Sequence, residues 1–470
     1  MSKLSSPGTQ LDSSGRILHG WDPEDPEKWD KAIAWRTLTI TTATMAVGFS
    51  AWYLVSAIAP LLNQIGFDLT DSQLYALTAI SGLSAGLFRL VFMFLPPVLG
   101  TRKLVTFSAL LFLLPMLGWF SVVQRPENTP FWELLAISFA SGFGGGVFAG
   151  FMPSTGYFFP KRLQGTALGL QAGIGNFGIS FIQLVAPWLM GFTLLGIGFV
   201  APQRLPDGSN VFVHNPAIFM APWAIVCALL AWTYLKDVPV KANFRQQLSI
   251  FGNVNTWVMT VVYLMTFGAF AGFAAQFALI INQIYGSGSS FAETIGVENL
   301  PRGAAYAFLG PLIGAGVRAA WGPLCDKFGG AIWTFIGGIG MTIFTAVAAL
   351  FLNPTDPDQF WWFLGAMLLM FFFTGLGNAG TFKQMPMIFP KHQAGGVIGW
   401  TSAIGAFGPF VVGILLSLMP IQAFFWGCVV FFAICTVLTW IFYARPKAPS
   451  PGKILRADCP ISINQKDFPS

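Results

Sequence analysis

Three basic residues, Arg89, Arg318 and Lys383, stand out because each lies inside a long apolar stretch of the sequence. All 19 Asp and Glu residues fall in the expected tails and loops or at the ends of such stretches. An ionisable side chain in a membrane interior costs several kcal/mol unless something pairs with it. Since the apolar stretches offer no carboxylate, a bound anion is the natural counter-ion.

The guanidinium group of arginine narrows the choice of anion. It is a planar fork that stays charged and pairs through two parallel hydrogen bonds with planar oxyanions. Two such forks facing one cavity suit a small anion such as nitrate, nitrite, bicarbonate or a carboxylate, whereas phosphate would need more donors. The alternative is snorkelling, in which Arg89 and Arg318 extend along apolar surface until their charged ends reach the membrane interface.

The composition explains why these stretches are expected to lie in a membrane. Apolar residues make up 54% of the 470-residue chain and charged residues only 9%, against about a quarter in soluble domains. This balance excludes a soluble enzyme, a disordered chain and a nucleic-acid-binding protein. The five Cys residues show neither metal-ligand spacing nor a disulfide pattern. We therefore expect no metal, no cofactor and no enzyme active site, and we expect the lipid bilayer as a partner.

Twelve apolar runs are long enough to cross a bilayer, which takes about 20 helical residues. They lie near residues 35–60, 72–97, 104–123, 131–158, 165–193, 216–235, 256–283, 303–322, 330–352, 360–388, 395–419 and 421–443. The predicted fold is an all-α polytopic membrane protein with 12 transmembrane helices in two pseudo-symmetric six-helix bundles. The predicted segments are an N-terminal tail (1–34), a first bundle (35–236), a linker (237–255), a second bundle (256–443) and a C-terminal tail (444–470).

The distribution of Lys and Arg predicts the orientation of these helices. If the N-terminus is cytoplasmic, 19 of the 25 basic residues lie in the tails and cytoplasmic loops. Only Arg125, Arg204 and Arg302 lie in loops on the opposite side of the membrane, and the other three lie within the apolar runs. This bias predicts a multi-pass protein of the cell (inner) membrane with both termini in the cytoplasm. Topology thus accounts for the basic charge without a nucleic-acid partner. We expect the protein to act as a monomer.

The two predicted bundles carry the same motifs at nearly the same spacing. Residues 159–161 (Phe-Pro-Lys) recur 230 positions later as 389–391, and Arg89 and Arg318 are 229 residues apart. Glycine strings recur in the fifth and eleventh runs at the same offset: Gly169, Gly173, Gly175 and Gly178 in the fifth, and Gly399, Gly405 and Gly408 in the eleventh. Such repeats are typical of secondary transporters, whose substrate site lies near the membrane midplane between the halves.

Helix packing is the main interpretation of the glycine strings, because small residues three or four positions apart let helices approach closely. The other interpretation is that glycines leave backbone open beside a small substrate and permit sliding. Asn176 interrupts the first string. Its amide inside an apolar helix either bonds a neighbouring helix or faces the cavity, and the sequence leaves these two possibilities open.

The end of the eighth run, residues 322–330, contains Asp326 and Lys327 and is close to a loop signature of the major facilitator superfamily. The equivalent loop after the second run, residues 100–103, lacks the Asp. We interpret Asp326 and Lys327 as a charged clasp that holds one conformation; the alternative is a plain polar turn. 

Further motifs extend the likeness. With the glycine strings and residues 21–26, 142–148 and 263–268, the chain resembles the nitrate/nitrite porters of this superfamily over nearly its whole length. The resemblance implies a carrier of nitrate and nitrite that works by alternating access. It also implies the residues that contact the anion: two arginines, two neutral hydrogen-bonding side chains, two phenylalanines that close the cavity, and one polar position of the second string. These are Arg89, Arg318, Asn176, Tyr263, Phe148, Phe267 and Ser402.

Lys383 departs from the family pattern, which usually has a neutral side chain at this position. We predict exchange of nitrate for nitrite, since the two arginines repel each other in an empty cavity and exchange needs no titrating group. The alternative is nitrate/proton symport, in which burial and the arginines push Lys383 toward its neutral form so that it takes up a proton with the anion. A carrier or channel for another small anion is a more distant alternative. A proton-coupled carrier of sugars or drugs is disfavoured, because it usually needs a membrane carboxylate and the interiors of the apolar runs contain none.

Overall fold

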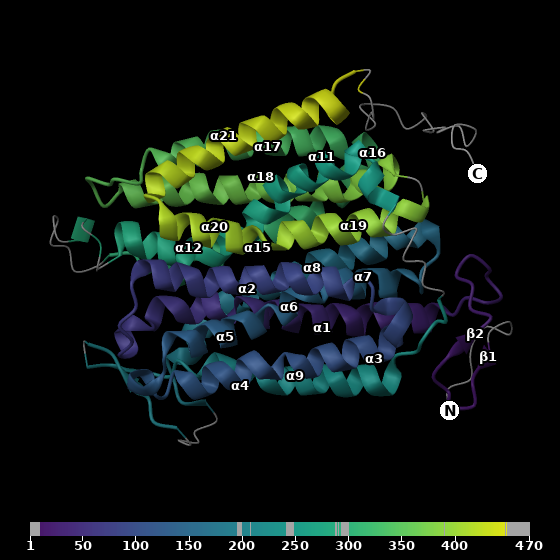
Figure 1. Cartoon of the computed structure of the whole chain (residues 1–470), viewed down its shortest axis with the longest axis horizontal. Helices are drawn as coiled ribbons and strands as arrows, with labels where there is room; N and C mark the ends of the chain where they lie inside the picture. Colours follow the sequence, from purple (N-terminus) through teal and green to yellow (C-terminus); the bar gives the residue numbers. More distant parts are fainter. Residues whose placement is uncertain are drawn as a thin grey trace.

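The structure, a computed structural model, is a bundle of long, roughly parallel helices with short loops at both ends (Figure 1). It describes residues 10–194, 200–206, 208–240, 249–286, 289, 291–292, 300–389, 391–446 and 448. The helices form two groups that follow each other in the sequence, one coloured purple through blue to teal and the other teal through green to yellow (Figure 1). Gln10 and the end of the last helix, Ala444, lie at the same end of the bundle.

Among the described residues, the first group contains nine α-helices. They are α1 (Lys31–Ile58), α2 (Asp71–Phe92), α3 (Pro96–Leu111), α4 (Leu113–Val122), α5 (Phe131–Ser141), α6 (Phe143–Gly146), α7 (Phe148–Gly156), α8 (Lys161–Met190) and α9 (Asn215–Tyr234). Short helices continue one another in two places. Helices α3 and α4 together make one crossing, and α5, α6 and α7 together make another. Short 3-10 turns in this group are η1 (Ala59–Leu61), η2 (Asn63–Ile65) and η3 (Pro126–Asn128).

The second group begins after a 3-10 turn, η5 (Ser249–Gly252). Its elements are α11 (Val254–Tyr263), the π-helical turn η6 (Leu264–Gly268), α12 (Ala269–Tyr285), α14 (Gly303–Tyr306), α15 (Leu309–Ala320), α16 (Gly322–Phe328), α17 (Gly330–Ala349), α18 (Gln359–Ile388), α19 (Lys391–Ala406), α20 (Gly408–Leu418), α21 (Ile421–Thr439) and the π-helical turn η7 (Trp440–Ala444).

Eleven helices of the described chain are long and apolar enough to cross a membrane. The twelfth expected crossing, near 303–322, is present as three consecutive helices, α14, α15 and α16, each of which is too short alone. The break between α15 and α16 falls at Trp321 and Gly322, directly before Pro323. A proline ring fixes φ and removes a backbone donor, so it favours such an interruption. The predicted twelve-helix fold is therefore confirmed, with its eighth crossing broken.

Helix ends follow from local sequence signals. Asp30 caps α1 by accepting hydrogen bonds from the N–H groups of Ala32 and Ile33, and therefore α1 begins at Lys31. Gly100 and Gly329 have φ values of 73° and 84°, a conformation that side chains with a Cβ rarely adopt. They are 229 residues apart, the same spacing as Arg89 and Arg318. The repeat found in the sequence thus recurs in the backbone.

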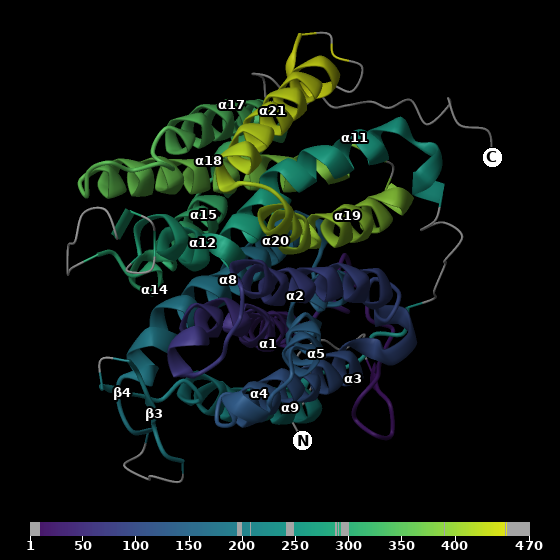
Figure 2. The same ribbon diagram turned by 60° about the vertical axis from the view of Figure 1, so that its left-hand side comes forward.

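The two groups meet along α2 and α8 of the first and α12, α15, α19 and α20 of the second (Figure 2). Small residues allow this contact. A Cβ at Gly82 would lie 2.7 Å from Pro409, and one at Gly173 would lie 3.1 Å from Ala319. The contact between α2 and the second group extends along α2 from Ser72 past Gly82. The hydroxyl of Ser72 donates to the carbonyl of Ser417.

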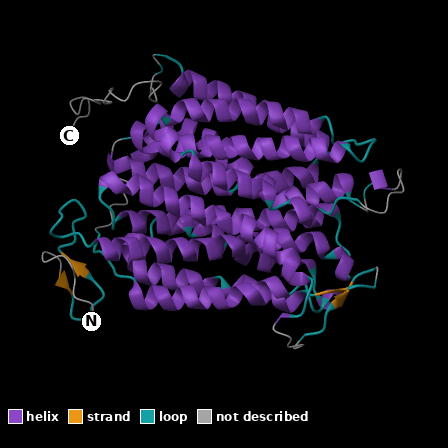
Figure 3. Ribbon diagram, turned by 180° about the vertical axis from the view of Figure 1, so that it is seen from behind, coloured by secondary structure: helices purple, strands orange, loops and turns teal. Residues whose placement is uncertain are grey.

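The strands of the described residues form two short hairpins outside the helix bundle (Figure 3). One pairs β1 (Gln10–Leu11) with β2 (Leu18–His19), and the other pairs β3 (Gln203–Arg204) with β4 (Asn210–Val211). The segment after the first hairpin is anchored to the bundle, since the indole N–H groups of Trp21 and Trp29 donate to the carbonyls of Tyr157 and Phe158.

Candidate functional site

Arg89 is buried at the boundary between the two groups of helices. Its Nε donates to the carbonyl oxygen of Gly145 at 2.8 Å, and its Nη1 donates to the carbonyl oxygen of Ser402 at 2.7 Å. Its Nη2 has no hydrogen-bond partner in the described chain. The guanidinium group is thus held by one backbone carbonyl from each half, with one nitrogen left for another acceptor.

The glycine string 142–146 places the carbonyl of Gly145 at Arg89. A Cβ on Gly144 would collide with the carbonyl oxygen of Gly48 in α1, and one on Gly145 would lie 2.6 Å from Trp52 and from Ala85 of α2. Only residues without a side chain let this backbone approach α1 and α2 so closely. The string therefore brings a main-chain acceptor within reach of a buried cation.

Arg318 lies on α15 in the other half, and only 6% of its surface is exposed. Its Nη1 and Nη2 have no hydrogen-bond partner among the described residues. The ion pairs of the described residues all lie elsewhere, so no carboxylate neutralises either arginine there. Both guanidinium groups are enclosed by protein, which differs from the snorkelling arrangement considered from the sequence.

Three phenylalanine rings connect the two arginines into a closed ring of contacts. The guanidinium carbon of Arg89 lies 4.8 Å from the centre of the Phe148 ring and 5.1 Å from that of Phe267. The guanidinium carbon of Arg318 lies 6.0 Å from the centre of Phe267 and 5.1 Å from that of Phe382. A contact between Phe148 and Phe382 completes this set: the centres of their rings lie 6.3 Å apart, and the rings meet edge to face.

This geometry limits the separation of the two charges. Because both lie over Phe267, the guanidinium carbons of Arg89 and Arg318 are at most about 11 Å apart, the sum of their distances to that ring. Aromatic faces attract cations, and they also exclude water, which strengthens attraction between an arginine and an anion by lowering the local dielectric constant. We call Arg89, Phe148, Phe267, Arg318 and Phe382 the arginine cage.

Tyr263 borders the arginine cage at the last residue of α11. Its ring stacks on Phe267 with centres 5.4 Å apart and an angle of 16°. Its hydroxyl lies beside Arg318, yet no described atom completes a hydrogen bond of good geometry with it. The π-helical turn η6 follows directly, and such turns are frequent at functional sites. It orients Tyr263 and Phe267 toward the same face.

Asn176 is fully buried on α8, and neither its amide nitrogen nor its amide oxygen has a hydrogen-bond partner in the described chain. Of the two possibilities that the sequence left open, the structure provides no bond to a neighbouring helix. The same helix packs against α15, where Gly173 faces Ala319, the residue after Arg318. A buried amide without partners costs free energy, so Asn176 keeps hydrogen-bonding capacity that no described residue uses.

Ser402 contributes through its main chain. Its carbonyl accepts the hydrogen bond from Arg89, whereas its hydroxyl donates to the carbonyl of Gly399 at 2.9 Å. The polar side chain that the resemblance implied at this position thus satisfies its donor within its own helix.

The glycine strings are packed against neighbouring helices. A Cβ on Gly178 would collide with the carbonyl oxygen of Ala46 in α1, and one on Gly408 would collide with that of Gly268 in η6. Gly175 and Gly405 make similar close approaches, to Met45 and to Tyr263 with Phe267. A Cβ on Gly399 would lie 3.1 Å from Met93, whereas one on Gly169 would meet open space. Packing therefore explains most of the two strings.

Neither Lys383 nor Lys327 of the charged loop is among the residues that form the arginine cage. Lys383 follows Phe382 on α18, five residues before the helix ends at Ile388, and is half-buried. Lys327 is exposed and lies over the ring of Phe328 at 5.2 Å. The side chain of Asp326 lies outside the described part, so the predicted clasp stays a prediction.

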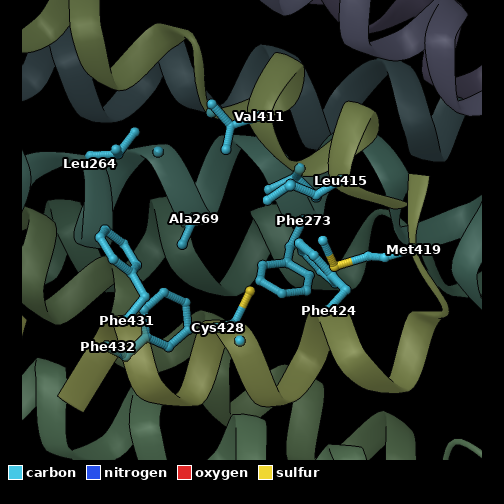
Figure 4. A pocket seen from close by; sticks show the side chains of 14 residues that line it. Leu264, Ala269, Phe273, Val411, Leu415, Met419, Phe424, Cys428, Phe431 and Phe432 are labelled. Carbon is cyan, nitrogen blue, oxygen red and sulfur yellow. The ribbon is translucent and has the colours of Figure 1, made fainter. Parts of the chain in front are cut away.

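A separate cavity of about 320 Å³ lies within the second half, between η6, α12, α20 and α21. Its walls are apolar, and the sulfur of Cys428 points into it between Phe273 and Phe431 (Figure 4). It contains none of the arginines. Because an anion needs charged or hydrogen-bonding groups, this cavity does not suit one.

Sequence reasoning missed four contacts of the site. The carbonyls of Gly145 and Ser402 are backbone groups, which side-chain identity does not reveal. Phe382 is one of 48 phenylalanines, and its position directly before Lys383 was the only signal. The indole ring of Trp52, whose centre lies 5.8 Å from the guanidinium carbon of Arg89, was not predicted either.

Comparisons with known proteins agree with this architecture. Residues 40–408 and 320–465 match the family described as the Major Facilitator Superfamily. The chain is 50% identical over 448 residues to the probable nitrate/nitrite antiporter NarK2 of Thermus thermophilus, covering 93% of this chain and 99% of that protein. It is 34% identical over 469 residues to the nitrate/nitrite transporter NarU of Escherichia coli strain K12, covering 93% and 98%.

The fold also matches a solved structure of the proton:xylose symporter XylE, with a TM-score of 0.61, 13% sequence identity, and coverage of 87% of this chain and 96% of that chain. At this identity the likeness concerns the fold alone. The family match, the two relatives and the twelve-helix architecture together show that the chain belongs to the major facilitator superfamily, within its nitrate/nitrite porter family.

Proposed function

We propose that this protein is a secondary transporter that moves nitrate and nitrite across the cell membrane by alternating access. The observation that carries the proposal is a pair of buried arginines, one from each half. Nη2 of Arg89 and both Nη atoms of Arg318 have no hydrogen-bond partner among the described residues. The relatives' names supply the substrates, since nitrate and nitrite appear in both. A small planar oxyanion between the two forks satisfies these nitrogens.

The other members of the site support a planar monoanion. Phe148 and Phe267 both lie over Arg89, so an anion paired with that arginine lies between or beside apolar rings. Tyr263 and Asn176 offer neutral donors without hydrogen-bond partners in the described chain. Such donors bind an anion without adding charge, and each hydrogen bond to a charged ligand contributes about 1.5–3 kcal/mol.

Exchange of nitrate for nitrite follows from the two like charges. Without an anion, Arg89 and Arg318 repel each other across the boundary between the halves, so the empty carrier closes with difficulty. One bound monoanion relieves this repulsion and lets the halves change conformation. Exchange is also the activity named for the Thermus relative. Nitrate/proton symport through Lys383, which is half-buried on α18, remains the alternative.

The distribution of basic residues supports an orientation with both termini in the cytoplasm. In the structure, Gln10 and Ala444 lie at the same end of the bundle, as an even number of crossings requires. We propose that a single chain suffices for transport, because both arginines come from one chain.

Counterflow in proteoliposomes tests the proposed function. Vesicles that contain the purified protein and internal nitrite are expected to take up labelled nitrate, in a saturable manner, faster than vesicles without internal anion. Chloride is expected to compete weakly, because a single-atom ion lacks the two separate acceptor atoms that pair with the two parallel donors of one fork. Flux that does not saturate and ignores the internal anion would indicate a channel, and inhibition by chloride as strong as by nitrite would contradict the geometric argument.

A further inference from the structure

A second cavity, which is polar and has a volume of about 610 Å³, lies at the end of the first half where the described chain begins. Three segments line it: the first hairpin at residues 14–17, the start of α3 at residues 96–103, and residues 237–240 after α9. We call this cavity the basic cleft. It is separate from the arginine cage, and the proposed transport cycle makes no use of it.

Asp237 holds the walls of the basic cleft together. Its N–H donates to the carbonyl of Arg16 at 2.9 Å, and its carbonyl accepts from the N–H of Leu18 at 2.9 Å. Its carboxylate oxygen Oδ1 accepts from the N–H of Arg102 at 2.8 Å. Gly100, with its positive φ, leaves the space that this carboxylate occupies. Asp237 therefore joins the hairpin, through its main chain, to the beginning of α3, through a partly buried carboxylate whose side chain is 16% exposed.

Positive charge exceeds negative charge around the basic cleft. Arg16, Arg102 and Lys103 line it, against the single carboxylate of Asp237. Lys236 lies next to it and donates to the carbonyl of Gly15. Burial and the neighbouring cations Arg36 and Arg102 lower the pKa of Lys236, and burial raises the pKa of Asp237. The shift of Lys236 thus reflects the neighbouring cations in part, whereas that of Asp237 reflects its burial.

Arg102 lines the cleft and keeps hydrogen-bonding capacity that no described residue uses. Only 3% of its surface is exposed, and its Nη1 has no hydrogen-bond partner among the described residues. Its Nε lies 3.7 Å from Oδ2 of Asp237, too far for a hydrogen bond. Its guanidinium carbon lies 4.1 Å from the centre of the Trp232 ring, and that of Arg16 lies 5.4 Å from the same ring. Stacking on Trp232 thus fixes both forks.

The surface beside the basic cleft is apolar and exposed. Val98 in the cleft wall is 63% exposed, and Trp232 and Tyr234 at the end of α9 are 41% and 51% exposed. Tryptophan and tyrosine at the end of a membrane helix are typical of the headgroup level of a bilayer. A ligand with an anionic head and apolar chains would contact both surfaces, whereas a small soluble anion would leave the apolar one uncovered.

We propose that the basic cleft binds the phosphate headgroup of an anionic phospholipid, with Arg102, Arg16 and Lys103 as its donors and the acyl chains along Val98 and Trp232. Arginine pairs with phosphate oxygens through its fork, and Lys103 adds a charge at the rim. Bound lipid would then bridge the first hairpin and the start of α3.

Thermal unfolding of the full-length protein in detergent, with phosphatidylglycerol or phosphatidylcholine added, tests the proposal. The wild type is expected to gain a larger increase in melting temperature from phosphatidylglycerol. The double variant Arg16→Gln/Lys103→Gln removes two exposed charges and keeps Arg102 with its packing. It is expected to bind this lipid on the order of tenfold more weakly, as estimated from the contribution of each basic residue near an anionic surface. Lys31→Gln, an exposed cation at the same end of the bundle, is the matched control.

Inorganic phosphate and glycerol phosphate distinguish a lipid from a soluble ligand. Stabilisation by phosphatidylglycerol alone, lost in the double variant and kept in Lys31→Gln, supports the proposal. Equal stabilisation by inorganic phosphate or glycerol phosphate would overturn the assignment to lipid. Equal effects of the two lipids on the wild type, or an unchanged preference in the double variant, would overturn the site itself.

Discussion

Nη1 of Arg89 donates a 2.7 Å hydrogen bond to the main-chain carbonyl of Ser402, which belongs to the other half of the molecule. This bond joins the two halves at the centre of the proposed site, and it depends on a backbone atom. Any movement that separates α2 from α19 must break it, and an anion that pairs with Arg89 can replace the lost acceptor. The contact thus connects anion binding with the conformational change.

The first prediction concerns Ser402 itself. Ser402→Ala should leave nitrate affinity near that of the wild type, because the carbonyl that accepts from Arg89 is retained and the hydroxyl donates within its own helix. The apparent KM for nitrate in proteoliposomes checks this. A large rise in KM with normal protein abundance would show that the hydroxyl contacts the anion after all.

Tyr263→Phe should weaken nitrate binding by roughly tenfold or more, since it removes a neutral donor to a charged ligand worth about 1.5–3 kcal/mol. The ring, its stacking on Phe267 and the protein's melting temperature should be unaffected. Isothermal titration of the purified variant with nitrate measures the change. Unchanged affinity would assign Tyr263 a purely structural role.

The glycine strings allow a matched test of packing. Gly408→Ala should destabilise the protein by about 1–3 kcal/mol, because the added methyl group collides with the carbonyl oxygen of Gly268. Gly169→Ala, where the methyl group meets open space, is the control from the other string. Melting temperatures in detergent compare the two. Equal melting temperatures would mean that the second string does not act through close packing.

Lys383→Gln distinguishes exchange from symport. If the carrier exchanges anions, the variant should still take up nitrate into nitrite-loaded vesicles, and an inward proton gradient should have no effect on uptake by the wild type. The measurement is uptake into vesicles with and without internal nitrite, each with and without the gradient. Proton-driven uptake in vesicles without internal anion, lost in Lys383→Gln while exchange survives, would establish symport in place of exchange.

The sequence was sufficient for the architecture and for the pair of arginines, because both depend on patterns that side chains carry. Long apolar runs predict the helices, and the 229-residue spacing of Arg89 and Arg318 predicts their equivalence. The carbonyls of Gly145 and Ser402 could not be predicted, since every residue has such a group and only the packing selects these two. The anchored N-terminal segment was also missed, because its tryptophans bond backbone atoms more than a hundred residues away.

The central claim is that Arg89 and Arg318 bind the anion together, and nitrate binding to purified protein tests it most directly. Lysine keeps the charge of each arginine but not its planar fork. The account predicts that Arg89→Lys and Arg318→Lys each weaken nitrate binding at least about tenfold, while Arg204→Lys, an exposed arginine outside the helices, binds like the wild type. Wild-type affinity in a folded Arg318→Lys variant, with its melting temperature unchanged, would contradict the account.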